Sequence, residues 1–212
     1  MSQHNYKASY KRKLPHFQPP GATLFVTCRL AGSIPQAVRE QLEAEAVART
    51  KRMPQIDDLD ERAVWLDQEQ KRRFGAWDNV LDRAESGPVW LQQPEIARIV
   101  AESLHNRDGQ TYALDAYCIM PNHVHIVLTP LEKPDGTYYA FQAIMHAFKL
   151  HTARQANKLL GREGQFWQHE SYDHVVRDRQ EWERIVRYVL NNPVKAGLAG
   201  SWEDWAWTYL KT

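Results

Sequence analysis

Two histidines separated by a single residue, His123 and His125, are the first candidates for chemistry in this sequence. They begin an apolar run that predicts a β-strand, and alternate residues of a strand point to the same face, roughly 6–7 Å apart. Two imidazoles placed in this way can bind one divalent cation, with Val124 and Ile126 turned into the core. The pair follows a Pro-Asn turn, where a ligand could reach it. His-x-His pairs also occur in strands that bind no ion.

Two enzyme classes that use paired histidines are excluded by the neighbouring residues. A histidine-triad hydrolase needs a third alternating histidine, but position 127 is Val127. A zinc nucleobase deaminase needs a His-x-Glu motif and a Pro-Cys-x-x-Cys motif, and the sequence contains neither.

A second candidate is Tyr188, in a predicted helix from Arg179 to Asn191. Apolar residues three and four apart form one buried stripe of this helix, and Tyr188 lies roughly 130° from the centre of that stripe. Arg184 and Arg187 share its side of the helix, where they could contact phosphate oxygens or lower the pKa of the phenol. The pattern alone equally allows a surface tyrosine between solvated arginines.

Asn192 follows Tyr188 by four residues, about 40° away around an ideal helix. Pro193 comes next, and the residue before a proline is disfavoured in α-helical geometry. We therefore expect the helix to end near Asn192, which could serve simply as a polar cap.

The elements that must position these residues alternate between strands and helices. We predict strands over residues 23–30, 111–120, 123–129 and 171–177, and helices over 35–52, 94–108, 138–160 and 179–191. An acidic run at residues 57–61 marks a further helix start. This order predicts an α+β fold in which helices cover a small antiparallel sheet, in one domain of residues 1–212 with a helical insertion at about residues 40–92.

Length and composition are those of an ordinary globular domain. The chain has 212 residues, of which 43% are hydrophobic and 25% charged. No apolar run is long enough for a membrane helix, and the N-terminal residues do not form a secretory signal. Cys28 and Cys118 are too few for a disulfide scaffold or a four-cysteine zinc site. We expect a cytoplasmic protein.

The net charge of +1 conceals a basic N-terminal arm. Residues 1–39 contain six lysines and arginines and no acidic residue, whereas residues 40–110 contain ten basic and fifteen acidic residues. Such an arm could contact the phosphates of a nucleic acid, or it could be a solvated tail.

Two motifs, read together, resemble those of the tyrosine transposases of the HUH endonuclease superfamily, and the REP-associated group of bacteria is the most similar. The first motif is Cys118-Ile119-Met120-Pro121-Asn122-His123-Val124-His125, and the second is Tyr188-Val189-Leu190-Asn191-Asn192-Pro193-Val194-Lys195-Ala196-Gly197-Leu198. Shorter similar stretches are residues 14–17, 166–173 and 175–178. The resemblance covers nearly the whole chain and is least distinctive at residues 40–92.

This resemblance implies a ferredoxin-like (RRM-like) core, with the histidine pair on a central strand and the nucleophile on a C-terminal helix. It implies that His123 and His125 bind a divalent metal ion, Mg²⁺ or Mn²⁺, and that Tyr188 is the single nucleophile. Asn192 corresponds to a third, polar metal ligand. The implied activity is metal-dependent cleavage and rejoining of single-stranded DNA through a 5′-phosphotyrosine, at hairpin-associated repeat sequences.

The expected partner is therefore single-stranded or hairpin DNA, bound by a monomer or homodimer with no membrane association. The residues expected to contact the nucleic acid are Lys11, Arg12, Lys13, Lys149, Arg177, Arg184 and Arg187. Two other interpretations stay open: a nucleic-acid-binding protein that keeps this fold without cleaving, and an ordinary α+β domain with incidental histidines.

Overall fold

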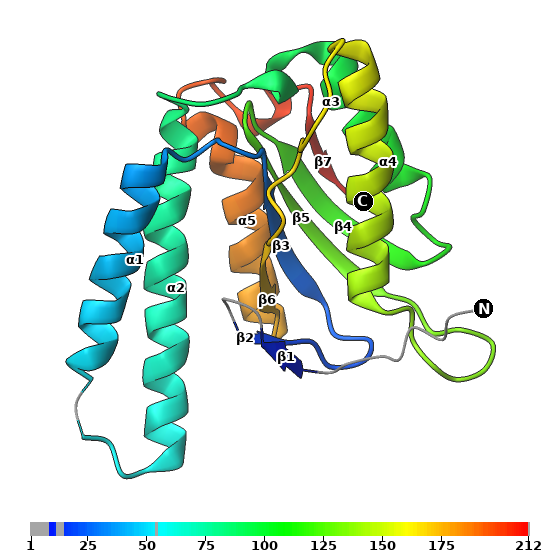
Figure 1. The fold of residues 1–212 in the computed structure, drawn as a ribbon. Helices are drawn as coiled ribbons and strands as arrows, with labels where there is room; N and C mark the ends of the chain where they lie inside the picture. Colours follow the sequence, from blue (N-terminus) through cyan, green and yellow to red (C-terminus); the bar gives the residue numbers. More distant parts are fainter. Residues whose placement is uncertain (1–8, 12–14, 54, 212) are drawn as a thin grey trace.

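The fold is described for residues 9–11, 15–53 and 55–211 of a computed structural model, with side chains from Gln18 onward (Figure 1). Its elements, in chain order, are β1 (Ser9–Lys11), β2 (Pro15–Phe17), β3 (Leu24–Arg29), α1 (Gln36–Lys51), α2 (Leu59–Arg83), η1 (Trp90–Gln92), α3 (Pro94–His105), β4 (Tyr112–Ile119), β5 (His123–Pro130), α4 (Phe141–Leu159), β6 (Tyr172–Val175), α5 (Arg179–Lys195), η2 (Trp202–Asp204) and β7 (Thr208–Leu210). Strands β1 and β2 pair in a separate small sheet.

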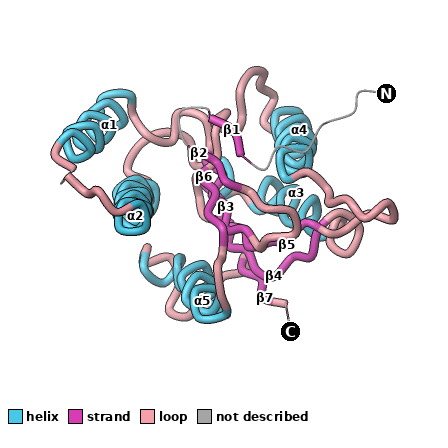
Figure 2. Tube along the Cα trace, turned by 90° about the horizontal axis from the view of Figure 1, so that it is seen from below, coloured by secondary structure: helices cyan, strands magenta, loops and turns pink. Residues whose placement is uncertain are grey.

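The central sheet has five antiparallel strands in the order β6-β3-β5-β4-β7. Helices α1 to α3 lie between β3 and β4, and α4 lies between β5 and β6, so the core follows the ferredoxin-like βαββαβ plan. Helices α3 and α4 cover one face of the sheet and α5 covers the other (Figure 2). The predicted α+β, ferredoxin-like fold is therefore confirmed.

The alternation of side chains along β5 separates the core from the candidate site. Val124 and Ile126 pack in the core beneath α3 and α4, as predicted, whereas Val127 packs on the opposite face with α5. His123 and His125 share the face of Val127 because residues two apart in a strand point the same way. Both histidines thus lie between the central strand and the C-terminal helix.

Helices α1 and α2 form a helical pair that stands beside α5 (Figure 1). The Asp58 side chain caps the start of α2 by accepting hydrogen bonds from two backbone N–H groups, as the acidic run predicts. Further along α2, Phe74 stacks on Tyr172 of β6 at 4.1 Å and meets Phe25 of β3 edge-on at 5.5 Å. These contacts hold α2 against the sheet. That residues 40–92 are an insertion stays a prediction.

The C-terminal helix is longer than predicted. We expected α5 to end near Asn192, but it continues to Lys195 with Pro193 inside it. The helix continues through the residue before proline and closes its next turn, with the Ala196 N–H donating to the Asn192 carbonyl at 3.0 Å. Asn192 therefore keeps its helical position below Tyr188 and is not a cap.

Three short strands were not predicted: the β1–β2 pair and edge strand β7. Each strand has three residues, too few for an alternating pattern to stand out. Among the described residues, no helix combines the length and hydrophobicity needed to cross a membrane.

Candidate metal centre and nucleophile

The two histidines of β5 direct their Nε2 atoms toward one another. These atoms are 3.0 Å apart, and both side chains are fully buried. The opposite ring nitrogens are occupied: His123 Nδ1 lies 2.6 Å from Asn122 Oδ1, and His125 Nδ1 lies 2.8 Å from Thr27 Oγ1. Partners on Nδ1 fix the orientation of each ring and leave Nε2 available to a cation.

Burial keeps both imidazoles neutral. It lowers the pKa of His123 to about 3, with a further contribution from the neighbouring His125 ring, and it lowers the pKa of His125 to about 3 as well. A buried imidazolium would lose its hydration, and the attraction of the Asp78 carboxylate, which raises the pKa of His123, is smaller than that cost. The neutral form present near neutral pH is the form that binds metal ions.

Asp78 of α2 supplies a carboxylate to this pair. The three side chains offer ligand atoms that all lie within 4.8 Å of one another. Asp78 Oδ1 lies 3.4 Å from His125 Nε2 and is buried without a hydrogen-bond partner. A buried carboxylate oxygen without a partner is costly unless a positive charge or a donor satisfies it. This donor set suits a divalent cation.

Asn192 approaches the same place from α5. It is fully buried; its amide nitrogen lies 3.2 Å from His125 Nε2, and its Oδ1 has no hydrogen-bond partner. Rotation of the amide by a half-turn exchanges the two atoms and would direct the oxygen toward the histidines. Two imidazole nitrogens, one carboxylate and one amide oxygen fit Mg²⁺ or Mn²⁺, and the same set also accommodates Zn²⁺.

Tyr188 lies next to this group, but its surroundings differ from those that the sequence predicts. The ring is half-buried, and its centroid lies 5.5 Å from that of His125. Its hydroxyl donates a hydrogen bond to Asp78 Oδ2. Burial and the charges of Asp78 and Asp82 raise the pKa of the phenol well above its ordinary value. The expectation of an exposed tyrosine with a lowered pKa is therefore wrong.

The arginines expected beside Tyr188 do not contact it. Arg184 pairs with Glu181 at 3.1 Å, and Arg187 is exposed on the outer side of α5. The nearby cation is Lys195, whose Nζ lies 2.7 Å from Asp82 Oδ2 and 6.0 Å from the Tyr188 ring centroid. The helical wheel placed Tyr188 off the stripe that packs on the sheet, and α2 covers it there.

Asp78 and Asp82 were missed by the sequence analysis. They lie four residues apart on the face of α2 that also carries Phe74 and Leu81. Carboxylates inside an apolar helical stripe are an unusual pattern and could have drawn attention to them. Burial and the neighbouring Asp78 raise the pKa of Asp82 to about 6.

The residues predicted to contact nucleic acid are placed in different surroundings. Lys149 donates to the backbone carbonyls of Gln168 and His169, at 2.9 and 3.2 Å. Arg177 pairs with Asp67 of α2. Arg12 and Lys13 lie outside the described residues, as does the side chain of Lys11. Their contacts with nucleic acid, and those of Lys149, Arg177, Arg184 and Arg187, stay predictions.

Comparisons with known proteins agree with the two motifs. Residues 92–192 match the model of the family described as "Transposase IS200 like". A Haemophilus influenzae protein provisionally named REP-associated tyrosine transposase is 26% identical over 98 residues, which is 44% of this chain and 56% of that protein. The REP-associated tyrosine transposase of Escherichia coli K12 is 26% identical over 94 residues, 44% of this chain and 52% of that protein.

A solved structure of a REP-associated tyrosine transposase bound to a REP hairpin shares the fold, with a TM-score of 0.52 and 16% sequence identity over 93% of this chain and 82% of that chain. The chain spans about half the length of the curated relatives it matches. The resemblance to REP-associated tyrosine transposases is thus confirmed. The matched segment includes His123, His125, Tyr188 and Asn192, whereas Asp78 lies outside it.

Proposed function

We propose that this protein cleaves and rejoins single-stranded DNA through a covalent bond between a DNA 5′-phosphate and Tyr188. The observation that carries the proposal is the position of Asp78. One of its oxygens faces the histidine pair and the other accepts the hydrogen bond of Tyr188, so the nucleophile and the candidate metal ligands meet at one carboxylate. The comparisons support the same activity independently.

The proposed metal ligands are His123, His125, Asp78 and Asn192, with Mg²⁺ or Mn²⁺ as the ion. When bound, the ion supplies positive charge that polarises the scissile phosphate. The chain's own residues supply the orientation: Thr27 and Asn122 hold the imidazoles from behind, and α5 holds Tyr188 and Asn192 one turn apart. Orientation of the phosphate for in-line attack contributes a large part of the rate in such sites.

The reaction begins with transfer of the phenol proton to Asp78 Oδ2, its hydrogen-bond acceptor. The phenolate oxygen of Tyr188 then attacks the phosphorus, and the bond from phosphorus to the 3′-oxygen breaks. The leaving oxygen takes up a proton from water and becomes a free 3′-hydroxyl, while the phosphate stays on Tyr188 as a 5′-phosphotyrosine. Because the phosphotyrosine bond retains the energy of the original ester, a second 3′-hydroxyl can reverse the step without ATP.

For the substrate we propose DNA with an unpaired segment beside a hairpin. The solved structure with the same fold is that of a protein bound to a REP hairpin. The buried position of the histidines favours a flexible single strand over a rigid duplex, because an unpaired strand can bend into a recessed site.

A second candidate function is binding of the same DNA without cleavage. One observation favours it: the pKa of Tyr188 is raised, and the neutral phenol is a poor nucleophile near neutral pH. The two functions differ in a single measurable product, the covalent adduct.

The test is incubation of the protein with hairpin-bearing single-stranded oligonucleotides and Mn²⁺, followed by a denaturing gel. The proposal expects a protein–DNA adduct and a free 3′-hydroxyl fragment, both lost when EDTA removes the ion. Tight binding of the oligonucleotide with no adduct at any Mn²⁺ concentration would favour the non-catalytic function.

A further inference from the structure

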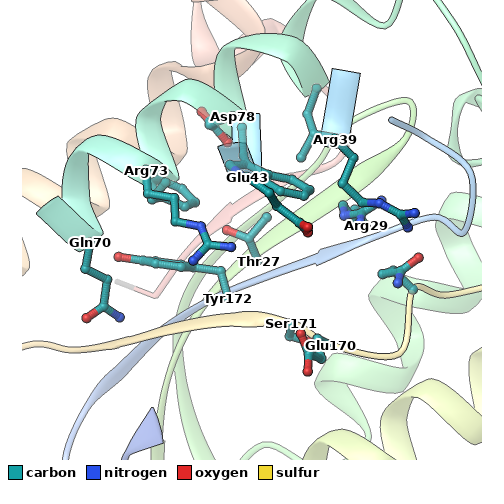
Figure 3. A pocket seen from close by; sticks show the side chains of 14 residues that line it. Thr27, Arg29, Arg39, Glu43, Gln70, Arg73, Asp78, Glu170, Ser171 and Tyr172 are labelled. Atoms are coloured by element: carbon teal, nitrogen blue, oxygen red, sulfur yellow. The ribbon is translucent and has the colours of Figure 1, made fainter. Parts of the chain in front are cut away.

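A cavity of about 120 Å³ opens beside the metal centre, between the α1–α2 pair, strand β3 and the segment of residues 168–172 (Figure 3). We propose that it binds one unpaired nucleotide of the DNA strand, adjacent to the phosphate that is cleaved. This inference rests on the proposed function, because it assigns to the helical pair the selection of a base next to the reacting phosphate. The volume is suited to a single planar ring and not to a run of nucleotides.

Three arginines line the cavity, and they come from three different elements: Arg29 of β3, Arg39 of α1 and Arg73 of α2. Within the described part of the chain, none of the three forms an ion pair. Burial, and to a smaller extent repulsion by the charge of Arg39, lowers the pKa of Arg29 to about 10, whereas Glu43, which also lines the cavity, raises it. A phosphate or the polar edge of a base would offset this repulsion, and guanidinium groups match both in geometry.

Aromatic side chains provide the second feature of a nucleotide site. Phe74, Trp77 and Tyr172 line the cavity. The indole N–H of Trp77 is buried and has no hydrogen-bond partner. A buried donor of this kind is usually satisfied, so its orphaned state indicates a ligand with an acceptor, such as a base carbonyl. Phe74 and Tyr172 stack on each other, and the Arg29 guanidinium lies 5.3 Å from the Trp77 ring centroid, so a base would contact the remaining surfaces of these rings.

The cavity adjoins the proposed site through two of its lining residues, although the histidines themselves are buried behind its wall. Thr27 and Asp78 line it, and both contact His125, through Nδ1 at 2.8 Å and Nε2 at 3.4 Å respectively. A nucleotide in the cavity would therefore lie next to a phosphate bound by the histidines. Arg39, Arg73 and Trp77 lie outside residues 92–192, the segment that matches the family model. The α1–α2 pair would thus add a specificity element to the common core.

The test measures binding of a fluorescent hairpin oligonucleotide to the Tyr188→Phe protein, so that cleavage does not intervene. Single abasic sites are placed in turn along the unpaired flank. We expect one position at which loss of the base weakens binding about tenfold. Adding Arg39→Gln or Trp77→Leu should weaken binding of the intact oligonucleotide by a similar factor. Neither change should weaken binding of the oligonucleotide that lacks that base.

Arg62→Gln is the matched control, because Arg62 is exposed on the same helix α2 and does not line the cavity. It should leave both affinities unchanged, and thermal melting verifies that every variant folds. Equal weakening of the intact and abasic oligonucleotides by the cavity variants would overturn the inference, as would no weakening at all. If an adduct forms at Tyr188 but the cavity variants weaken both oligonucleotides equally or not at all, the proposed function stands and the nucleotide site is refuted. If the cavity variants weaken only the intact oligonucleotide but no adduct forms, cleavage is refuted and the nucleotide site stands.

Discussion

Asp78 connects the two chemical halves of the site. Its carboxylate contacts His125 through one oxygen and the Tyr188 hydroxyl through the other, so its charge acts on both. The same negative charge that attracts a cation raises the pKa of the phenol. Positive charge between Asp78 and the histidines would lower that pKa again, because a bound cation is the largest local charge in such a site. The proposed metal binding and the proposed activation of Tyr188 would therefore be coupled.

The first prediction concerns Asp78→Asn, which keeps the shape of the side chain and removes its charge. We expect Mn²⁺ affinity to fall on the order of tenfold or more, because an amide oxygen is a weaker ligand than a carboxylate. Titration calorimetry with Mn²⁺ measures this directly. Asp67→Asn, a substitution elsewhere on α2, is the control and should bind Mn²⁺ like the unmodified protein. Equal affinities for the two variants would exclude Asp78 as a ligand.

The buried histidines also predict how stability depends on pH in the absence of metal. Their pKa is about 3 when folded, below the ordinary value, so the unfolded state binds two more protons as pH falls from 6.5 toward 3. Their stabilising contribution is present above about pH 6.5 and is lost through that window. Asp82 has the opposite effect, because its pKa is raised to about 6 in the folded state. Its stabilising contribution is present below about pH 4 and is lost as the pH rises from about 4 to 6.

Two histidines outweigh one aspartate, so acidification from about pH 6 to 4 should destabilise the metal-free protein. Each uncompensated proton changes the free energy of unfolding by about 1.4 kcal/mol per pH unit. Urea denaturation in EDTA at several pH values gives the slope. In the double variant His123→Gln, His125→Gln, the slope of the free energy of unfolding against pH should lose the contribution of two protons. An unchanged slope in that variant would show that the histidines are not buried in the neutral form.

At the scale of elements, the sequence patterns located the regular structure well and the contacts between helices poorly. The periodicity that predicted α5 and the strand carrying His123 and His125 was strong because each element buries one face in a single core. The contact of α2 with Tyr188 was not predictable, because no local pattern specifies which helix covers a polar residue. Pro193 failed as a stop signal because tertiary packing of α5 outweighs the local preference of the residue before proline.

Helix α2 offers a test of backbone energetics at Gly75. This glycine lies in the helix interior, and a Cβ atom there would meet no atom within 4 Å. Gly75→Ala should raise the free energy of unfolding by about 0.5–1 kcal/mol, because alanine restricts the unfolded chain and favours the helix. Gly109→Ala is the contrasting control: it also has open space, but its φ of +72° disfavours alanine. A lower melting temperature for Gly75→Ala would contradict the helical geometry described here.

At the scale of the whole molecule, the central sheet separates the larger apolar core from the candidate site. Helices α3 and α4 cover the face with the larger apolar core, and α5 covers the other face (Figures 1 and 2). His123, His125 and Tyr188 lie on the side of α5, where Tyr188 contacts His125 and Asp78 of α2. The α+β plan was predictable from the order of the elements, and the resemblance to the transposases implied its ferredoxin-like form. The packing of α2 against the sheet and α5 was not predictable, because residues 40–92 carry the least distinctive sequence.

This organisation predicts how DNA binding responds to salt. Affinity for hairpin-bearing single strands should exceed that for plain duplex, and it should weaken steeply as salt rises, because phosphate contacts release counterions. Deleting the basic residues 1–13 should weaken binding more than it slows cleavage of bound DNA. Fluorescence anisotropy across a salt series measures the slope for each DNA. Equal affinity for duplex and single strand at every salt concentration would contradict the preference for unpaired DNA.

The most direct test of the central claim is to locate the DNA on the protein after reaction. Trypsin cleaves after Arg187 and Lys195 and releases residues 188–195, in which Tyr188 is the sole tyrosine. Mass spectrometry of protein incubated with a hairpin oligonucleotide and Mn²⁺ should find the nucleotide mass on this peptide. Tyr188→Phe should abolish it and leave DNA binding within a few-fold. Tyr209→Phe, on edge strand β7, should retain it. A nucleotide on any other peptide, or an adduct formed by the Tyr188→Phe protein, would contradict the account.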